Sequence, residues 1–117
     1  MKLNEPQAAA LAQLSQVVPI QPKAMFGGIG LYSDGLFFAL MDKARLYLKV
    51  DDSNRPDFEA RGLGPFNPYA ERGGPAMQYY PVPEDVLDDP GELRIWAEAA
   101  LDVARRAAAR KRGAKKR

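Results

Sequence analysis

The segment 25–50 constrains the fold most, because it holds three strand-like stretches joined by very short turns. Residues 25–32 form the first stretch, residues 36–41 are apolar on both faces, and residues 45–50 alternate between apolar and polar side chains. Such alternation is typical of a strand with one face on a core and the other partly in water. Parallel neighbours need a crossover of about a dozen residues or more, so these turns predict an antiparallel meander.

Helix signals flank this meander. Asn4 with Gln7 forms a capping box before apolar residues at helical spacing, which predicts an N-terminal helix. Asp89 is the expected N-cap of a C-terminal helix, with Pro90 in its first position and an apolar stripe to Ala104. Between them we expect a short helix over residues 55–60, a hairpin of residues 66–71 and 76–81, and one helical turn over residues 83–87. The predicted fold is α+β: a two-layer, five-stranded antiparallel sheet with helices on one face, in the order α-β-β-β-α-β-β-α.

Charge divides the chain into two unequal parts. Residues 1–104 carry nine basic and fifteen acidic side chains, a net charge of −6, whereas residues 105–117 carry eight basic and no acidic ones, a net charge of +8. Blocks of like charge are typical of solvated tails. At this length one domain is expected. We therefore expect an α+β domain over residues 1–104 and a basic, flexible tail over residues 105–117.

The composition narrows the possible chemistry, since the chain has no cysteine and no histidine. Disulfides and thiolate metal sites are thereby excluded, and so is catalysis by serine–histidine or cysteine–histidine pairs. We therefore expect no enzymatic activity, no cofactor and no metal. No signal peptide is recognisable, and no apolar run approaches the roughly 18 residues of a membrane span. These features predict a cytoplasmic protein that does not contact a membrane.

Several motifs in register resemble one known family. They are Met25-Phe26-Gly27-Gly28, Gly30-Leu31-Tyr32, Leu46-Tyr47-Leu48-Lys49, the block from Asp51 to Phe58, and Tyr79-Tyr80. Over about residues 23–104 the chain is similar to the TfoX N-terminal domain family (TfoX/Sxy), bacterial regulators of natural competence. The resemblance implies an α+β domain with an antiparallel sheet and a regulatory role. In the named regulators a second helical domain follows; here a basic segment follows, so we expect a stand-alone N-terminal domain.

The first group of candidate site residues combines tyrosines and cations around the polar face of the sheet. We expect the following residues to form a surface for a protein partner: Arg45, Tyr47, Lys49, Arg55, Tyr79 and Tyr80. Tyrosine is frequent at interfaces because it joins an apolar ring to a polar end. Contact between two copies of the chain, or simple cover of a half-wet sheet face, is an alternative role. Base stacking is disfavoured by the acidic charge of residues 1–104.

The second group is the basic segment, a candidate for sequence-independent contact with nucleic-acid phosphates. Its members are Arg105, Arg106, Arg110, Lys111, Arg112, Lys115, Lys116 and Arg117. A solvated helix end is the alternative, because cations near a helix C-terminus complement its dipole.

Two further motifs are expected to be structural. The glycines at positions 27, 28 and 30 are not followed by the helix that a phosphate loop needs, so we expect a bulge or a close backbone approach. The acidic segment 51–57 lacks the spacing and closing glutamate of a calcium loop. Its expected role is helix capping together with a structural Arg–Asp network. The alternatives are a polar patch that binds a partner and a weak cation site.

Together these observations favour a non-enzymatic regulatory or adaptor domain that acts through protein–protein contact, with an unnamed partner and a homodimer as one option. The alternative is a nucleic-acid-associated regulator that uses the basic segment as its anchor.

Overall fold

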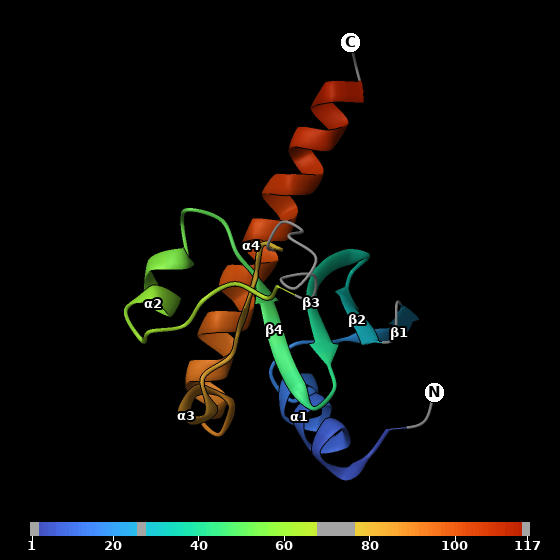
Figure 1. The fold of residues 1–117 in the computed structure, drawn as a ribbon. Coiled ribbons are helices and arrows are strands. Elements are labelled where there is room, and N and C mark those ends of the chain that lie inside the picture. The colour runs from blue at the N-terminus through green and yellow to red at the C-terminus, as the bar shows by residue number, and fades with distance from the viewer. Residues whose placement is uncertain (1–2, 26–27, 68–76, 116–117) are drawn as a thin grey trace.

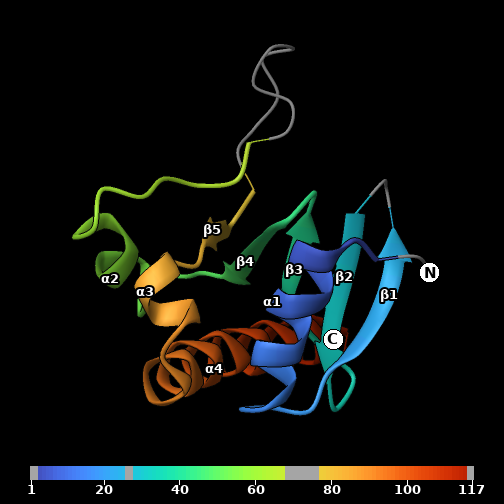
Figure 2. The same ribbon diagram turned by 90° about the horizontal axis from the view of Figure 1, so that it is seen from below.

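The structure, a computed structural model, describes residues 3–25, 28–67 and 77–115. The elements are α1 (Glu5–Ser15), β1 (Gln21–Met25), β2 (Gly28–Ser33), β3 (Leu36–Asp42), β4 (Arg45–Lys49), α2 (Arg55–Glu59), β5 (Tyr79–Pro81), α3 (Glu84–Leu87) and α4 (Pro90–Lys115). Figures 1 and 2 show one curved sheet with α1, α3 and α4 gathered along one side of it.

The five strands form one antiparallel sheet in the order β1-β2-β3-β4-β5. The predicted α+β class and antiparallel sheet are therefore confirmed, and the doubly apolar stretch 36–41 is the central strand. The strands are divided differently from the prediction, because the segment expected as one strand over residues 25–32 contributes to both β1 and β2.

The second predicted hairpin is only partly described. Its second strand corresponds to β5, while most of its first strand lies outside the described residues. At its base the Phe66 N–H donates to the Tyr79 carbonyl at 2.7 Å, and the Met77 N–H donates to the Phe66 carbonyl at 2.8 Å. The chain around Phe66 thus pairs with the start of β5 without forming a sixth strand within the described residues.

The tight geometry of β1, β2 and β3 depends on small residues. Asp34 and Gly35, at the β2–β3 turn, have φ angles of 51° and 76°, the left-handed region that favours Gly and tolerates Asp. A Cβ added to Gly28 would lie 2.7 Å from the Met41 carbonyl oxygen, and one added to Gly30 would overlap the Met25 side chain. The predicted close backbone approach is confirmed for Gly28. Gly30 is instead covered by the Met25 side chain, and Gly27 lies outside the described residues.

Helix α4 and the strands β3 and β4 enclose the hydrophobic core. The side chains in it come from every helix and from four of the strands, and the largest fully buried ones are Phe38, Phe58, Leu14, Leu31, Met41, Leu48, Leu93, Val86 and Val103. Phe58 ties the short helix α2 to this core, because its ring packs edge-on against Trp96 at a centroid distance of 4.8 Å and contacts Tyr80 at 5.5 Å.

The two long helices start as the sequence predicts. Asn4 accepts a hydrogen bond from the Gln7 N–H while the Gln7 side chain accepts one from the Asn4 N–H, a complete capping box. Asp89 Oδ1 accepts from the backbone N–H groups of Gly91 and Glu92, satisfying donors that an uncapped helix leaves free. Gln7 also donates to the Lys43 carbonyl, which joins the start of α1 to the β3–β4 turn.

Helix α4 continues without a break to Lys115. The basic segment expected as a separate flexible tail is therefore helical over residues 105–115, and its boundary at residue 104 does not coincide with the end of an element. In Figure 1 the C-terminal turns of α4 extend beyond the rest of the domain. The reason is local: residues 105–112 are alanines and basic residues, which are strong helix formers, with no glycine or proline among them.

Candidate functional site

The face of the sheet turned away from the helices carries a group of aromatic side chains, here called the outer-face cluster. Its members are Tyr32, Phe37, Tyr47, Phe66 and Tyr79. Strand register places four of them together, because residues paired across neighbouring strands share a face. Tyr32 on β2 pairs with Phe37 on β3. Tyr79 on β5 pairs with Lys49, which lies two positions after Tyr47 on β4 and therefore shares its face.

Ring contacts join the outer-face cluster into two sets. Tyr32 and Phe37 stack at a centroid distance of 5.0 Å, and Phe37 lies 5.6 Å from Tyr79. Tyr47 packs separately against Phe66 at 4.6 Å. Offset aromatic pairs at such distances each add about 0.5–1.5 kcal/mol beyond area burial. The cluster therefore stabilises the outer face, while Tyr32, Phe37, Tyr47 and Phe66 keep part of their surface exposed.

Three cations border the outer-face cluster. The Lys23 ammonium lies 5.7 Å from the Tyr32 ring centroid, and the Lys49 ammonium lies 5.1 Å from the Tyr79 ring centroid. Arg45 is exposed on the same face of β4. Such cation–π contacts contribute about 0.5–1 kcal/mol at exposed sites. The result is a partly apolar surface with positive charge around it.

Tyr79 and Tyr80 are buried, although both were expected on the surface for a protein partner. Each is only 5% exposed, and they point to opposite faces of the sheet, since neighbouring residues of a strand alternate. Tyr80 belongs to the core against Phe58, so its placement on the partner surface was wrong. Tyr79 does lie beside Lys49, but burial raises the pKa of its phenol to about 12, with a smaller contribution from Tyr32.

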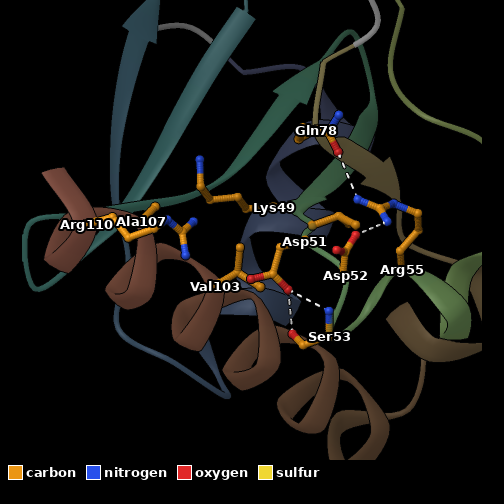
Figure 3. Close-up of a pocket in the computed structure, with 10 residues that line it drawn as sticks. Lys49, Asp51, Asp52, Ser53, Arg55, Gln78, Val103, Ala107 and Arg110 are labelled. Atoms are coloured by element: carbon orange, nitrogen blue, oxygen red, sulfur yellow. Dashed lines mark hydrogen bonds and ion pairs between the residues drawn. The ribbon is translucent and has the colours of Figure 1, made fainter.

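A second feature is an open hollow of about 510 Å³ between the end of β4, the following loop and α4. Figure 3 shows side chains from these elements around it. The lining residues are Lys49, Val50, Asp51, Asp52, Ser53, Arg55, Gln78, Val103, Ala107 and Arg110. The hollow thus brings two members of the expected partner surface, Lys49 and Arg55, together with Arg110 of the basic segment.

One side of the hollow holds a network of ion pairs and hydrogen bonds. Arg106 donates to both Asp51 carboxylate oxygens, at 3.1 Å for the nearest, and to the Ser53 hydroxyl at 2.7 Å. Arg55 pairs with Asp52 and reaches the Gln78 side-chain oxygen at 3.4 Å. Burial raises the pKa of Asp51, but hydrogen bonds from Ser53 and Arg106 outweigh it and hold that pKa below its usual value.

A buried asparagine holds the loop that supports this network. Asn54, only 4% exposed, accepts from the Asp51 N–H at 2.9 Å and donates to the Lys49 carbonyl at 3.1 Å. Its side chain therefore fixes the turn after β4 instead of capping α2. The structural role expected for segment 51–57, an Arg–Asp network, is present. Among the residues that the structure describes, no group of three or more acidic side chains is placed to hold a metal ion.

The other side of the hollow is cationic. Lys49 is half-buried, and its pKa is lowered first by burial and then by the nearby charges of Arg110 and Lys111. Figure 3 shows the Lys49 and Arg110 side chains at the same end of the hollow. Lys49 therefore meets two cations of α4 at a place where solvent only partly screens their charges.

The remaining members of the basic segment are divided between contacts and solvent. Arg105 pairs within the helix with Asp102 at 2.6 Å. Lys111 and Arg112 are exposed near the C-terminal end of α4, and Arg110, also exposed, lines the hollow. The side chains of Lys115, Lys116 and Arg117 lie outside the described residues.

Sequence reasoning missed two parts of this arrangement. Phe37 and Phe66 were not recognised as members of the outer-face cluster, because residues 36–41 are apolar on both faces and show no alternation that would assign Phe37 to one of them. The meeting of Arg106 and Arg110 with the β4–α2 loop was also missed. Their spacing of four residues, which places both on one side of a helix, was the available signal.

The model of the TfoX N-terminal domain matches residues 12–104, most of the chain. The chain belongs to the TfoX N-terminal domain family. This confirms the resemblance found in the sequence, and the family is regulatory in type. A comparison with curated proteins gives no match. In the described part of the chain, no helix combines the length and apolarity that crossing a membrane requires.

Proposed function

We propose that this TfoX N-terminal domain is a non-enzymatic regulatory module that binds a protein partner through the outer face of its sheet. One observation carries the proposal: partly exposed aromatic rings gather on the sheet face that no described helix covers. Aromatic side chains are enriched at the centres of protein interfaces, where they exclude water.

The charge around the outer-face cluster specifies the chemistry of the partner. Lys23, Arg45 and Lys49 border the rings, so a matching surface carries an apolar or aromatic anchor with carboxylates around it. Complementary charge raises the association rate and excludes unsuitable partners more than it adds affinity. A second copy of this chain meets the apolar requirement but presents the same cations, so we favour a different, acidic protein.

Site-directed photocrosslinking tests this proposal. A photoreactive phenylalanine analogue at Tyr47 should give one discrete adduct in cells, whereas the same analogue at the exposed position Glu98 on α4 should not. The purified partner should then bind the wild-type chain and lose affinity for Tyr47→Ala, because truncation removes an interface ring. Equal labelling from both positions, or an identified partner that binds Tyr47→Ala as well as the wild type, contradicts the proposal.

A second candidate function is association with nucleic acid through α4. It is favoured by Arg110, Lys111 and Arg112, which are exposed near the C-terminal end of α4. Phosphate contacts of this kind depend strongly on salt. Binding to DNA and RNA at two salt concentrations should weaken in Lys111→Gln/Arg112→Gln and in a chain ending at residue 104. Binding that ignores both changes removes this function.

A further inference from the structure

Two positive charges line the cationic end of the hollow, and a third acts on it from the same helix. Lys49 lies at the end of β4 and Arg110 lines the same hollow from α4, while Lys111 follows Arg110 and also acts on the Lys49 ammonium. Helix α4 brings its two cations to β4 across 61 and 62 positions of sequence. Like charges repel each other, so this arrangement opposes folding unless something compensates it.

The carboxylates of the hollow do not provide that compensation. Asp51 is held by Arg106 and Ser53, and Asp52 is held by Arg55. Within the described ranges, no carboxylate lies within 4.0 Å of the charged nitrogens of Lys49, Arg110 or Lys111. The Lys49 ammonium has a neutral neighbour instead, the Tyr79 hydroxyl at 3.4 Å.

The hydrogen-bond donors of Lys49 and Arg110 and the open shape of the hollow suit a tetrahedral oxyanion. A guanidinium offers two parallel N–H donors, and an ammonium offers a compact charge with three donors, a pair of groups that recurs around phosphate. The hollow of about 510 Å³ is larger than one phosphate and opens to solvent, so it has room for the rest of a phosphorylated molecule.

We propose that this hollow is a phosphate-binding site, in which Lys49 and Arg110 hold the phosphate group and Lys111 adds positive potential at its rim. The phosphate belongs either to a small polyphosphate ester or to a nucleic-acid strand that continues along α4. This site shares Lys49 with the border of the outer-face cluster, but the proposed protein contact rests on the aromatic rings of that cluster. Failure of either proposal leaves the other intact.

Calorimetric titration of the full chain tests the site. The probes are sodium pyrophosphate and an eight-residue thymidine oligonucleotide, each at constant ionic strength set with chloride. Lys49→Met and Arg110→Gln should each weaken binding about tenfold or more, because each removes charged donors. Arg94→Gln removes the same charge from an exposed position elsewhere on α4 and should bind as the wild type does.

The outcomes separate the two sources of phosphate. Pyrophosphate binding that Lys49→Met and Arg110→Gln abolish supports a small phosphorylated ligand. Binding of the oligonucleotide alone, with the same dependence on the two variants, supports a nucleic-acid strand. No saturable binding of either probe, or equal binding by all three variants, overturns the proposal. Unfolding of each variant is measured in parallel; Lys49→Met should unfold no more easily than the wild type, because burial and Arg110 already disfavour the charge that it removes.

Discussion

Arg106, on the last helix, donates hydrogen bonds to both carboxylate oxygens of Asp51, 55 positions earlier in the chain. The pair joins α4 to the loop after β4, and its Asp51 lines the hollow. It also turns one residue of the basic segment into part of the folded domain.

The interaction between Asp51 and Arg106 should be measurable as a coupling free energy. Asp51→Asn, Arg106→Gln and the double variant should show a coupling of about 0.5–1 kcal/mol in urea unfolding, because the pair is only partly exposed and bidentate. The matched control is Asp102 with Arg105, a more exposed pair within one helix turn, where about 0.3 kcal/mol is expected. If the two double-mutant cycles give equal coupling free energies, the Asp51–Arg106 pair does not stabilise the fold more than an exposed ion pair within a helix does.

Acid should weaken the fold partly through Asp51. The pKa of Asp51 is lower in the folded chain than in the unfolded chain. Its contribution to the free energy of unfolding is therefore complete above the pKa of the unfolded chain, about 3.9, and is lost as the pH falls through the pKa of the folded chain. The free energy of unfolding should therefore fall below about pH 4, and Asp51→Asn should fall less steeply there. The measurement is urea unfolding at a series of pH values from 6 to 3. A wild type and variant with parallel profiles would exclude this role of Asp51.

Alkali should act on Tyr79. Since burial raises its pKa to about 12, the folded chain keeps this proton after the unfolded chain has lost it. The corresponding stability is complete below the unfolded pKa of about 10 and is lost as the pH rises from there towards 12. In a phenolate absorbance titration, Tyr79→Phe should remove the latest of the tyrosine transitions. Loss of an early transition instead shows that Tyr79 is open to solvent.

The two described glycines of β2 should respond differently to a methyl group. Gly28→Ala places its Cβ against the Met41 carbonyl oxygen, a backbone atom that cannot move alone, and should cost about 1–3 kcal/mol. Gly30→Ala meets the end of the flexible Met25 side chain and should cost less. Thermal unfolding of both variants gives the order. A larger loss for Gly30→Ala would show that Met25 has no alternative rotamer.

Tyr80 and Tyr47 test the assignment of the two sheet faces. Tyr80→Ala removes a ring from the core and should destabilise the chain by about 3–5 kcal/mol. Tyr47→Ala removes a partly exposed ring from the outer-face cluster and should cost about 1 kcal/mol. Urea unfolding measures both. Similar losses would mean that the outer face is packed as tightly as the core.

Local signals in the sequence predicted much of this fold. The capping box at Asn4 and the alternation along residues 45–50 involve neighbours within a few positions, and the structure contains both features. The division between β1 and β2 was not predictable in this way, because the apolar and glycine pattern over residues 25–32 is compatible with one bent strand or with the end of one and the start of another.

The candidate site was harder to predict because its contacts are distant in sequence. Tyr79 and Tyr80 look alike as a pair, and only the register with β4 decides that one faces the core. The run of positive charge after residue 104 indicates a solvated segment, while the helix formers within it favour a continued helix. Neither signal predicts that Arg106 pairs with Asp51, because that contact depends on how α4 packs against the loop after β4.

The strand order also has a consequence for the newly made chain. Each strand of the sheet pairs with the one synthesised just before it, so the sheet can grow step by step as the polypeptide emerges. Much of its apolar face, however, stays open to water until Pro90–Lys115 has been translated. The nascent chain is therefore most vulnerable to aggregation in the interval between the translation of β5 and that of α4.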